Sequence, residues 1–130
     1  MVDIVDKQTR SYMMSRIRGK WTVPEKIIHG YLKSRKVRHE MHPNMAGNPD
    51  IMLKGKETVV FVDGDFWHGK DYEKRKSKLQ PFWKDKIRKN MERDKKHTKL
   101  LKQGGWNVVR IWEEDVRKRP EWCVEQLEHL

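Results

Sequence analysis

The stretch ETVVFVDG, residues 57–64, is the most apolar in the chain and decides the fold class. The four residues before Asp63 are apolar on both faces of an extended chain, which is typical of a strand covered on each side. Asp63 ends this run and, if side chains alternate, shares a face with Val59 and Phe61. A carboxylate therefore stands where an apolar residue is expected. Gly64 follows, and it lets the backbone turn or a ligand approach closely.

The segments around this strand predict one α/β domain with the order α-β-β-β-α-β-α. A capping box at Thr22–Glu25 opens the first helix, and Gly104-Gly105 ends the long one. Residues 64–81 are expected to be irregular, residues 1–21 an N-terminal arm that contacts DNA, and residues 22–130 the catalytic core. The expected helices cover about 22–36, 82–103 and 120–130, and the strands 37–41, 50–53, 57–63 and 106–112. This order is that of a restriction-endonuclease-like fold, a mixed β-sheet flanked by helices.

The charge of the chain indicates a polyanionic partner. The formal net charge is +11, and residues 70–102 alone hold 14 Lys or Arg against 5 Asp or Glu. A basic block is often only a solvated helix face. Here apolar residues such as Trp83 and Ile87 interrupt it at regular intervals, so disorder does not explain it. Double-stranded DNA is the expected partner.

The long helix carries a carboxylate in its apolar stripe. Steps of three and four residues place Asp94 in line with Ile87, Met91, Thr98 and Leu101. A buried carboxylate needs a cation, a histidine or several donors as partners. A structural ion pair or a cap is the alternative interpretation. Lys95 and Lys96 are expected to point away from this stripe.

Other acidic residues suggest a site for a hard cation. Asp50 opens the strand next to the one that Asp63 ends, and two carboxylates at neighbouring strand ends suit Mg²⁺, for which Mn²⁺ can substitute. Glu25 lies at the edge of the inward side of its helix, but it can also serve only the capping box. His68 is the histidine next to this acidic cluster in sequence, and the other five are expected in loops or at the surface.

The remaining composition restricts compartment and cofactors. A single cysteine, Cys123, excludes an internal disulfide and a Cys-rich zinc site. No apolar run has the length of a membrane span, and the N-terminus lacks a hydrophobic signal stretch. A cytoplasmic protein of bacterial, archaeal or phage type is therefore expected.

Several blocks of the sequence resemble the very short patch repair endonucleases. They occur in the family's order and cover nearly the whole chain. The blocks are Asp6-Lys7, Thr9–Ser11, Met14, Gly47–Ile51, Val60–His68, Phe82-Trp83, Lys86-Ile87, Lys89–Asp94, Gly105-Trp106 and Trp112-Glu113.

The resemblance implies a magnesium-dependent monomeric enzyme that nicks one DNA strand beside a T·G mismatch, the product of 5-methylcytosine deamination. It implies that Asp50 binds metal with the backbone carbonyl of Val62 and that His68 is the general base oriented by Asp94. From their positions in the sequence, Asp63 and Glu25 are expected to belong to the same site. The DNA-contacting residues that the resemblance implies are Met14, Phe66, Trp67, Trp83, Lys86 and Asn90. Phe66 and Trp67 follow a turn directly and are expected at the surface as wedges between bases.

The chain also departs from its relatives' pattern. Asp65 stands where common restriction-type motifs have a lysine, which agrees with a histidine-based mechanism. Asp65, Lys70, Tyr72 and Glu114 stand where repair members hold a structural zinc through cysteines and histidines. Zinc is therefore not expected, and other contacts must hold the loop after Gly69.

Two alternatives remain at this point. A nuclease of a mobile element or phage, related to homing endonucleases, would use the same chemistry with another DNA specificity. A non-catalytic DNA-binding module is the second alternative. It is disfavoured because carboxylates at positions 50, 63 and 94 would only oppose its attraction to phosphate.

Overall fold

The computed structural model describes residues 21–130. The arm expected at residues 1–21, with Met14, therefore lies outside the described part apart from Trp21. The elements are α2 Val23–Ser34, β1 His39–Met41, β2 Ile51–Leu53, β3 Thr58–Asp63, α3 Tyr72–Arg75, the 3₁₀ turn η1 Lys76–Lys78, α4 Pro81–Gln103, β4 Asn107–Trp112, α5 Glu113–Lys118 and α6 Pro120–Glu128.

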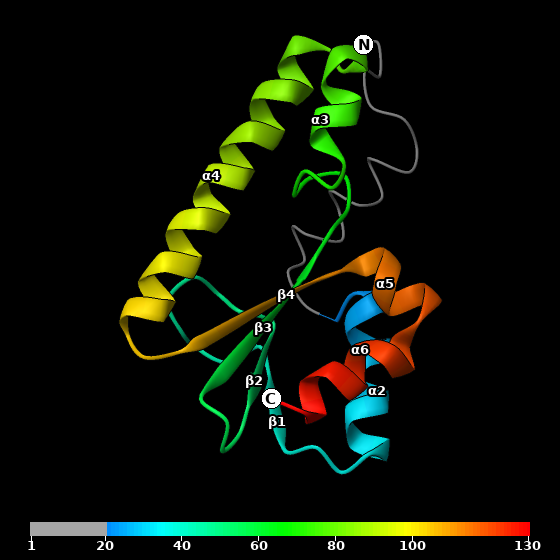
Figure 1. Ribbon diagram of the computed structural model, residues 1–130, viewed down its shortest axis with the longest axis vertical. Helices are drawn as coiled ribbons and strands as arrows, with labels where there is room; N and C mark the ends of the chain where they lie inside the picture. Colours follow the sequence, from blue (N-terminus) through cyan, green and yellow to red (C-terminus); the bar gives the residue numbers. More distant parts are fainter. Residues whose placement is uncertain (1–20) are drawn as a thin grey trace.

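The four strands form one mixed sheet in the order β1-β2-β3-β4. The pairs β1–β2 and β2–β3 are antiparallel, while β3 and β4 are parallel. Helix α4 is the crossover between the two parallel strands (Figure 1). The predicted fold class, an α/β sheet flanked by helices, is confirmed.

Helices cover both faces of the sheet, which explains why every residue of β3 is buried. Val60 and Val62 pack toward α2, α5 and α6 on one face. Val59 and Phe61 pack with Leu101 of α4 on the other. Side-chain alternation then places Asp63 on the α4 face, as the sequence predicted.

The two long helices begin and end where the sequence indicates. Thr22 caps α2 in a capping box with Glu25, and Pro81 occupies the first turn of α4, where its missing N–H costs nothing. Trp83, Ile87 and Leu101 are the buried residues of α4, which confirms the predicted stripe. Beyond the sheet, the N-terminal half of α4 runs beside α3 (Figure 1).

One strand start and three short helical elements differ from the prediction. β1 begins at His39 rather than residue 37, because Lys36 adopts a left-handed φ of 58° and the Val37 N–H still bonds to Leu32 at the end of α2. The segment 64–81 contains α3 and η1, and α5 follows β4. A single helical turn has too few residues to show an apolar period, so none of these is visible in the sequence. No helix within residues 21–130 combines the length and apolarity that a membrane crossing requires.

Candidate active site

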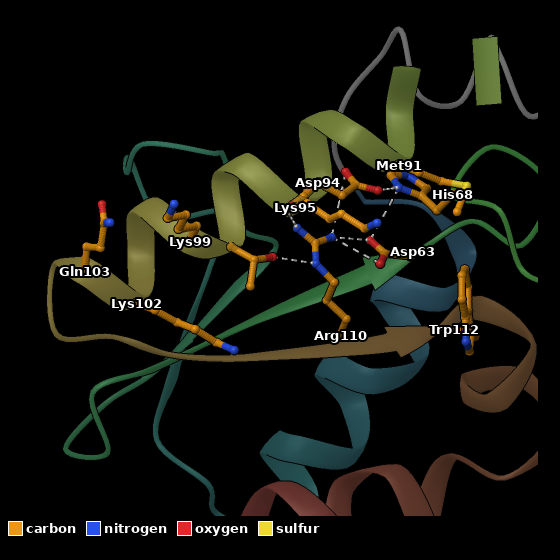
Figure 2. Close-up of a pocket in the computed structure, with 11 residues that line it drawn as sticks. Asp63, His68, Met91, Asp94, Lys95, Lys99, Lys102, Gln103, Arg110 and Trp112 are labelled. Atoms are coloured by element: carbon orange, nitrogen blue, oxygen red, sulfur yellow. Dashed lines mark hydrogen bonds and ion pairs between the residues drawn. The ribbon is translucent and has the colours of Figure 1, made fainter. Parts of the chain in front are cut away.

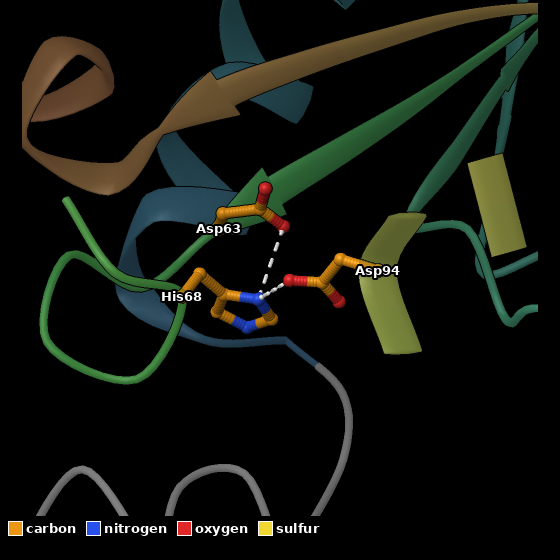
Figure 3. A group of neighbouring side chains, drawn as sticks. All are labelled: Asp63, His68 and Asp94. Carbon is orange, nitrogen blue, oxygen red and sulfur yellow. Dashed lines mark hydrogen bonds and ion pairs between the residues drawn. The ribbon is translucent and has the colours of Figure 1, made fainter. Parts of the chain in front are cut away.

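Three predicted residues from three different segments meet at the end of β3. Asp63 ends that strand, His68 lies in the turn that follows, and Asp94 comes from the inward face of α4 (Figure 3). His68 Nδ1 lies 2.5 Å from Asp94 Oδ2 and 3.7 Å from Asp63 Oδ1. One ring nitrogen of His68 and one carboxylate oxygen of each aspartate, atoms of the kind that bind metal ions, lie within 4.8 Å of one another. The expectation that Asp94 faces inward toward a partner is therefore confirmed, and the partner is His68.

A fourth residue, Arg110 of β4, completes this group, and it is not among the site residues predicted above. Its Nη1 donates to both carboxylate oxygens of Asp63 at 3.1 Å, and its Nη2 donates to the Asp94 backbone carbonyl at 3.1 Å. Its Nε donates to Thr98 Oγ1 at 3.0 Å, and the guanidinium lies 4.1 Å from the centre of the Phe61 ring. Arg110 thus compensates the charge of the carboxylates from below.

A signal for Arg110 was present in the sequence. The β4 strand alternates, and Val108 packs on the α4 face of the sheet, so Arg110 and Trp112 lie on that same face. A charged residue on this inward face is the same anomaly that marks Asp63. The parallel register pairs Arg110 with Phe61, which brings its side chain beside the strand end.

The bond to Asp94 determines the proton arrangement of His68. An ionised carboxylate can only accept, so Nδ1 carries the hydrogen, and in the neutral imidazole Nε2 keeps its lone pair. Nε2 lies on the far side of the ring from both carboxylates (Figure 3). This is the arrangement of a general base whose partner stabilises the imidazolium after proton transfer.

The cluster opens into a pocket of about 770 Å³ between α4 and β4. Asp63, His68 and Asp94 lie at one end of it, and Arg110 lies in its floor (Figure 2). Lys95 also lines the pocket, so the expectation that it points away from the Asp94 stripe is wrong for this residue. It is adjacent to Asp94 on the helix, and its long stem reaches back to the pocket.

Asp50 lies behind the strand end, next to the peptide of Val62. Its side chain is buried, with 7% of the residue exposed, and Oδ2 accepts a hydrogen bond from the Val62 N–H at 2.7 Å. The contact brings the Asp50 carboxylate beside the last residue of β3 before Asp63. Carboxylate and peptide oxygens are the donors that Mg²⁺ prefers.

Glu25 has other bonded partners than the His68 cluster. Its Oε1 accepts from the backbone N–H of Thr22 at 3.0 Å and from the Thr22 hydroxyl at 2.8 Å. Its Oε2 forms a hydrogen bond with His42 Nε2. His42 lies in a loop as expected, but its side chain is nearly buried, and its backbone N–H donates to the Asp50 carbonyl at 2.8 Å. Glu25 thus reaches the Asp50 region through His42.

The aromatic residues expected to contact DNA form a cluster on the N-terminal half of α4. Trp67 and Trp83 pack edge to face with ring centres 5.3 Å apart, above the buried Ile87. Trp67 is 8% exposed, so the expectation that it lies at the surface is wrong. Phe66 is half-buried. The turn after Gly64 folds back onto α4, where Asn90 Nδ2 donates to the Trp67 carbonyl at 3.2 Å.

The exposed aromatic ring of this region belongs to Phe82, with 51% exposure. The ammonium of Lys86 lies 5.6 Å from the centre of that ring. The Phe82 ring also packs edge to face on Trp83, at 4.8 Å between centres. Phe82 and Lys86 thus form the solvent side of the cluster that Trp67 and Trp83 support from below.

Polar contacts hold the loop after Gly69. They involve the positions at which repair endonucleases were expected to carry zinc ligands. Lys70 forms an ion pair with Glu114 of α5, and Arg75 donates to the Lys70 carbonyl at 2.6 Å. Asp65 Oδ1 accepts from the Glu114 N–H at 3.5 Å. Lys118 and Lys70 lower the pKa of Glu114 to about 2, and burial raises that of Asp65. Tyr72, the fourth position, packs against the aromatic cluster instead.

Comparisons with known proteins identify the relatives of this chain. The family model described as DNA mismatch endonuclease Vsr matches residues 2–74. The chain is 36% identical to the type II nicking enzyme V.HpaIIP of Haemophilus parainfluenzae, over 93% of this chain and 89% of that protein. It is 32% identical to the DNA mismatch endonuclease Vsr of Escherichia coli strain K12, over 98% and 83%.

A solved structure supports the fold. The catalytic domain of homing endonuclease I-Bth0305I superposes with a TM-score of 0.57 at 20% identity, covering 83% of this chain and 92% of that domain. The four-stranded mixed sheet with α4 as crossover is therefore the architecture of a known nuclease domain.

Proposed function

The chain belongs to the family of the DNA mismatch endonuclease Vsr and is a DNA endonuclease, and we propose that it nicks one strand of duplex DNA beside a T·G mismatch. The observation that carries the proposal is the 2.5 Å contact between His68 Nδ1 and Asp94 Oδ2 at the mouth of a pocket. It leaves Nε2 as the acceptor of a proton from water.

In the proposed reaction, His68 Nε2 takes a proton from a water molecule as the water oxygen attacks phosphorus. The bond from phosphorus to the 3′ oxygen breaks, and that oxygen leaves with its electron pair. Asp94 stabilises the imidazolium that forms, and Asp63, at 3.7 Å, adds a second negative charge. Arg110 donates to the Asp63 carboxylate and to the Asp94 backbone carbonyl, and its Nη1 lies 3.8 Å from Asp94 Oδ1, so the group need not reorganise when the proton moves.

A divalent ion would be held by the Asp50 carboxylate and the backbone carbonyl of Val62, with Mg²⁺ as the expected ion and Mn²⁺ as a substitute. The buried carboxylate against the Val62 peptide fits this role because it presents hard oxygen donors. When bound, the ion supplies positive charge to the phosphorane and the departing oxygen. Asp63 was expected to share the ion, but both of its oxygens already bond to Arg110. We therefore assign Asp63 to the His68 cluster rather than to the ion.

Mismatch selectivity would come from the aromatic cluster. Opening a base step costs a few kcal/mol and costs least at a mismatch. Phe82 is exposed and Phe66 half-buried, and the packed Trp67 and Trp83 support both rings. We propose that Phe66 and Phe82 meet the DNA first, and that Trp67 follows when the cluster opens. Lys86 and Asn90 lie on the same half of α4 and would contact the mismatched pair.

The test uses two duplexes with one label on each strand, identical except for T·G or C·G at one position. The protein is incubated with Mg²⁺, with Mn²⁺ or with chelator, and the products are separated on denaturing gels. We expect one nick, in one strand of the T·G duplex, which chelation abolishes without unfolding the protein. Equal cleavage of both duplexes would overturn mismatch selectivity and favour the mobile-element nuclease. Cleavage in chelator would overturn the role of Asp50.

A further inference from the structure

The pocket at the His68 cluster continues along the C-terminal half of α4 as a basic groove. Lys95, Lys99 and Lys102 line it, with Arg110 in the floor. Figure 2 shows these residues in succession along α4 from Asp94 toward the end of the helix; the Lys95 side chain extends toward Asp63, and Lys99 and Lys102 lie on the side away from His68. The groove therefore leads away from the reacting group in the direction opposite to the aromatic cluster.

The three lysines of the groove have no acidic partner among residues 21–130. Some other surface lysines do: Lys89 pairs with Asp85 at 3.1 Å, and Lys118 pairs with Glu114 at 2.5 Å. Like charges four residues apart, as at Lys95 and Lys99, destabilise a helix by a few tenths of a kcal/mol. The repulsion between these lysines therefore slightly destabilises α4, and a bound polyanion would remove this cost.

The spacing of the row fits a nucleic-acid strand. Lys95, Lys99 and Lys102 follow at steps of four and three, so they lie on one face of α4. At 1.5 Å per residue the row is about 10 Å long. Phosphates of one strand of B-DNA advance about 3.4 Å along the helix axis, so the row has the axial length of about three nucleotides.

We propose that Lys95, Lys99 and Lys102 bind about three consecutive phosphates of one DNA strand on one flank of the nick. The proposal rests on the proposed function, because the DNA must enter at His68. The two halves of α4 then have different tasks: the aromatic half distinguishes bases, and the lysine half holds the backbone without sequence preference. The whole helix, of 23 residues, is about 34 Å long, close to one turn of B-DNA.

The experiment compares the triple variant Lys95→Gln, Lys99→Gln, Lys102→Gln with the wild type and with Lys96→Gln. Lys96 is also exposed on α4, but it does not line the groove, so it is the matched control. Binding to a T·G duplex is measured in chelator across a salt series, where no cleavage occurs. Each phosphate on either flank of the nick site is then replaced, one at a time, by a neutral methylphosphonate.

For the triple variant we expect the slope of log affinity against log salt to fall by about 2–3, since each phosphate contact contributes about 0.9. Lys96→Gln should keep the wild-type slope. Neutral linkages at about three successive positions on one flank should weaken the wild type and leave the triple variant unaffected. The proposal is overturned if the triple variant and Lys96→Gln have equal slopes, or if the triple variant remains sensitive to those linkages. Because binding is the readout, failure of the cleavage mechanism would not produce either result.

Discussion

Two carboxylate–histidine pairs in this molecule look alike as contacts and differ in their surroundings. Glu25 pairs with His42, and Asp94 pairs with His68, each across more than fifteen residues of chain. The Glu25 side chain is 1% exposed, and its other oxygen belongs to the capping box of α2. Asp94 and His68 instead line an open pocket, with Arg110 beneath them.

A buried carboxylate–histidine bond therefore does not by itself mark a catalytic base. Both pairs fix an imidazole, but only His68 has access to a pocket that a phosphate could enter. Within residues 21–130, a guanidinium compensates the carboxylates of the His68 pair, and no arginine bonds to Glu25. We therefore infer that Glu25 and His42 position the Asp50 segment and that His68 acts on water.

The largest expected effect distinguishes the two histidines. His68→Ala should lower single-turnover nicking by roughly 10²- to 10⁴-fold, the usual contribution of a positioned general base, while DNA binding persists. His42→Ala should lower the melting temperature, because it leaves Glu25 buried without its partner, and should reduce nicking less. Equal losses of rate in the two variants, at equal folded fraction, would contradict the comparison.

The next effect concerns the two carboxylates. Asp94→Asn should slow nicking by about 10²- to 10³-fold, since an amide can donate to Nδ1 and so stabilise the wrong tautomer. The acid limb of its pH–rate profile should move, because a neutral amide no longer stabilises the imidazolium. Glu25→Gln should leave the shape of the profile unchanged. A profile that moves for Glu25→Gln and not for Asp94→Asn would reverse the assignment.

A smaller effect is expected from Arg110, which contacts the carboxylates beside His68. Arg110→Ala leaves Asp63 without its donor, and we expect a loss of about 2–3 kcal/mol in the free energy of unfolding. The value is at the low end for a buried pair, because the arginine side chain is 24% exposed. Urea titration measures it, and the double variant Arg110→Ala, Asp63→Asn should recover part of the loss. No recovery would mean that Arg110 stabilises the fold through Phe61 and Thr98 alone.

The smallest effect belongs to an ion-pair network at the surface. Folding lowers the pKa of Glu114 from its ordinary 4.5 to about 2. Its bonds to Lys70 and Lys118 therefore stabilise the fold fully above pH 4.5, and this contribution is lost as the pH falls toward 2. The stability difference between wild type and Glu114→Gln should decrease over that range, whereas Glu121→Gln, an exposed carboxylate on α6, should show little change. A pH-independent difference for Glu114→Gln would exclude the charge as its cause.

Much of the fold follows from local patterns. The apolar strand at β3, the stripe of α4, the capping box at Thr22 and the glycines after Gln103 each predict an element that the structure contains. The short elements α3, η1 and α5 were missed, since one or two turns carry no period. The exposure of Trp67 was judged from its position after Gly64, and tertiary packing on Trp83 reversed it.

Residue order alone predicts which faces of β3 and α4 carry Asp63 and Asp94, because side-chain direction repeats with a fixed period along each element. It could not determine their partners. Arg110 reaches Asp63 only because β4 lies parallel to β3 in the register that pairs Arg110 with Phe61. His42 reaches Glu25, and Lys70 reaches Glu114, through contacts between distant segments. Such contacts depend on how elements pack in three dimensions, and local periodicity carries no information about that packing.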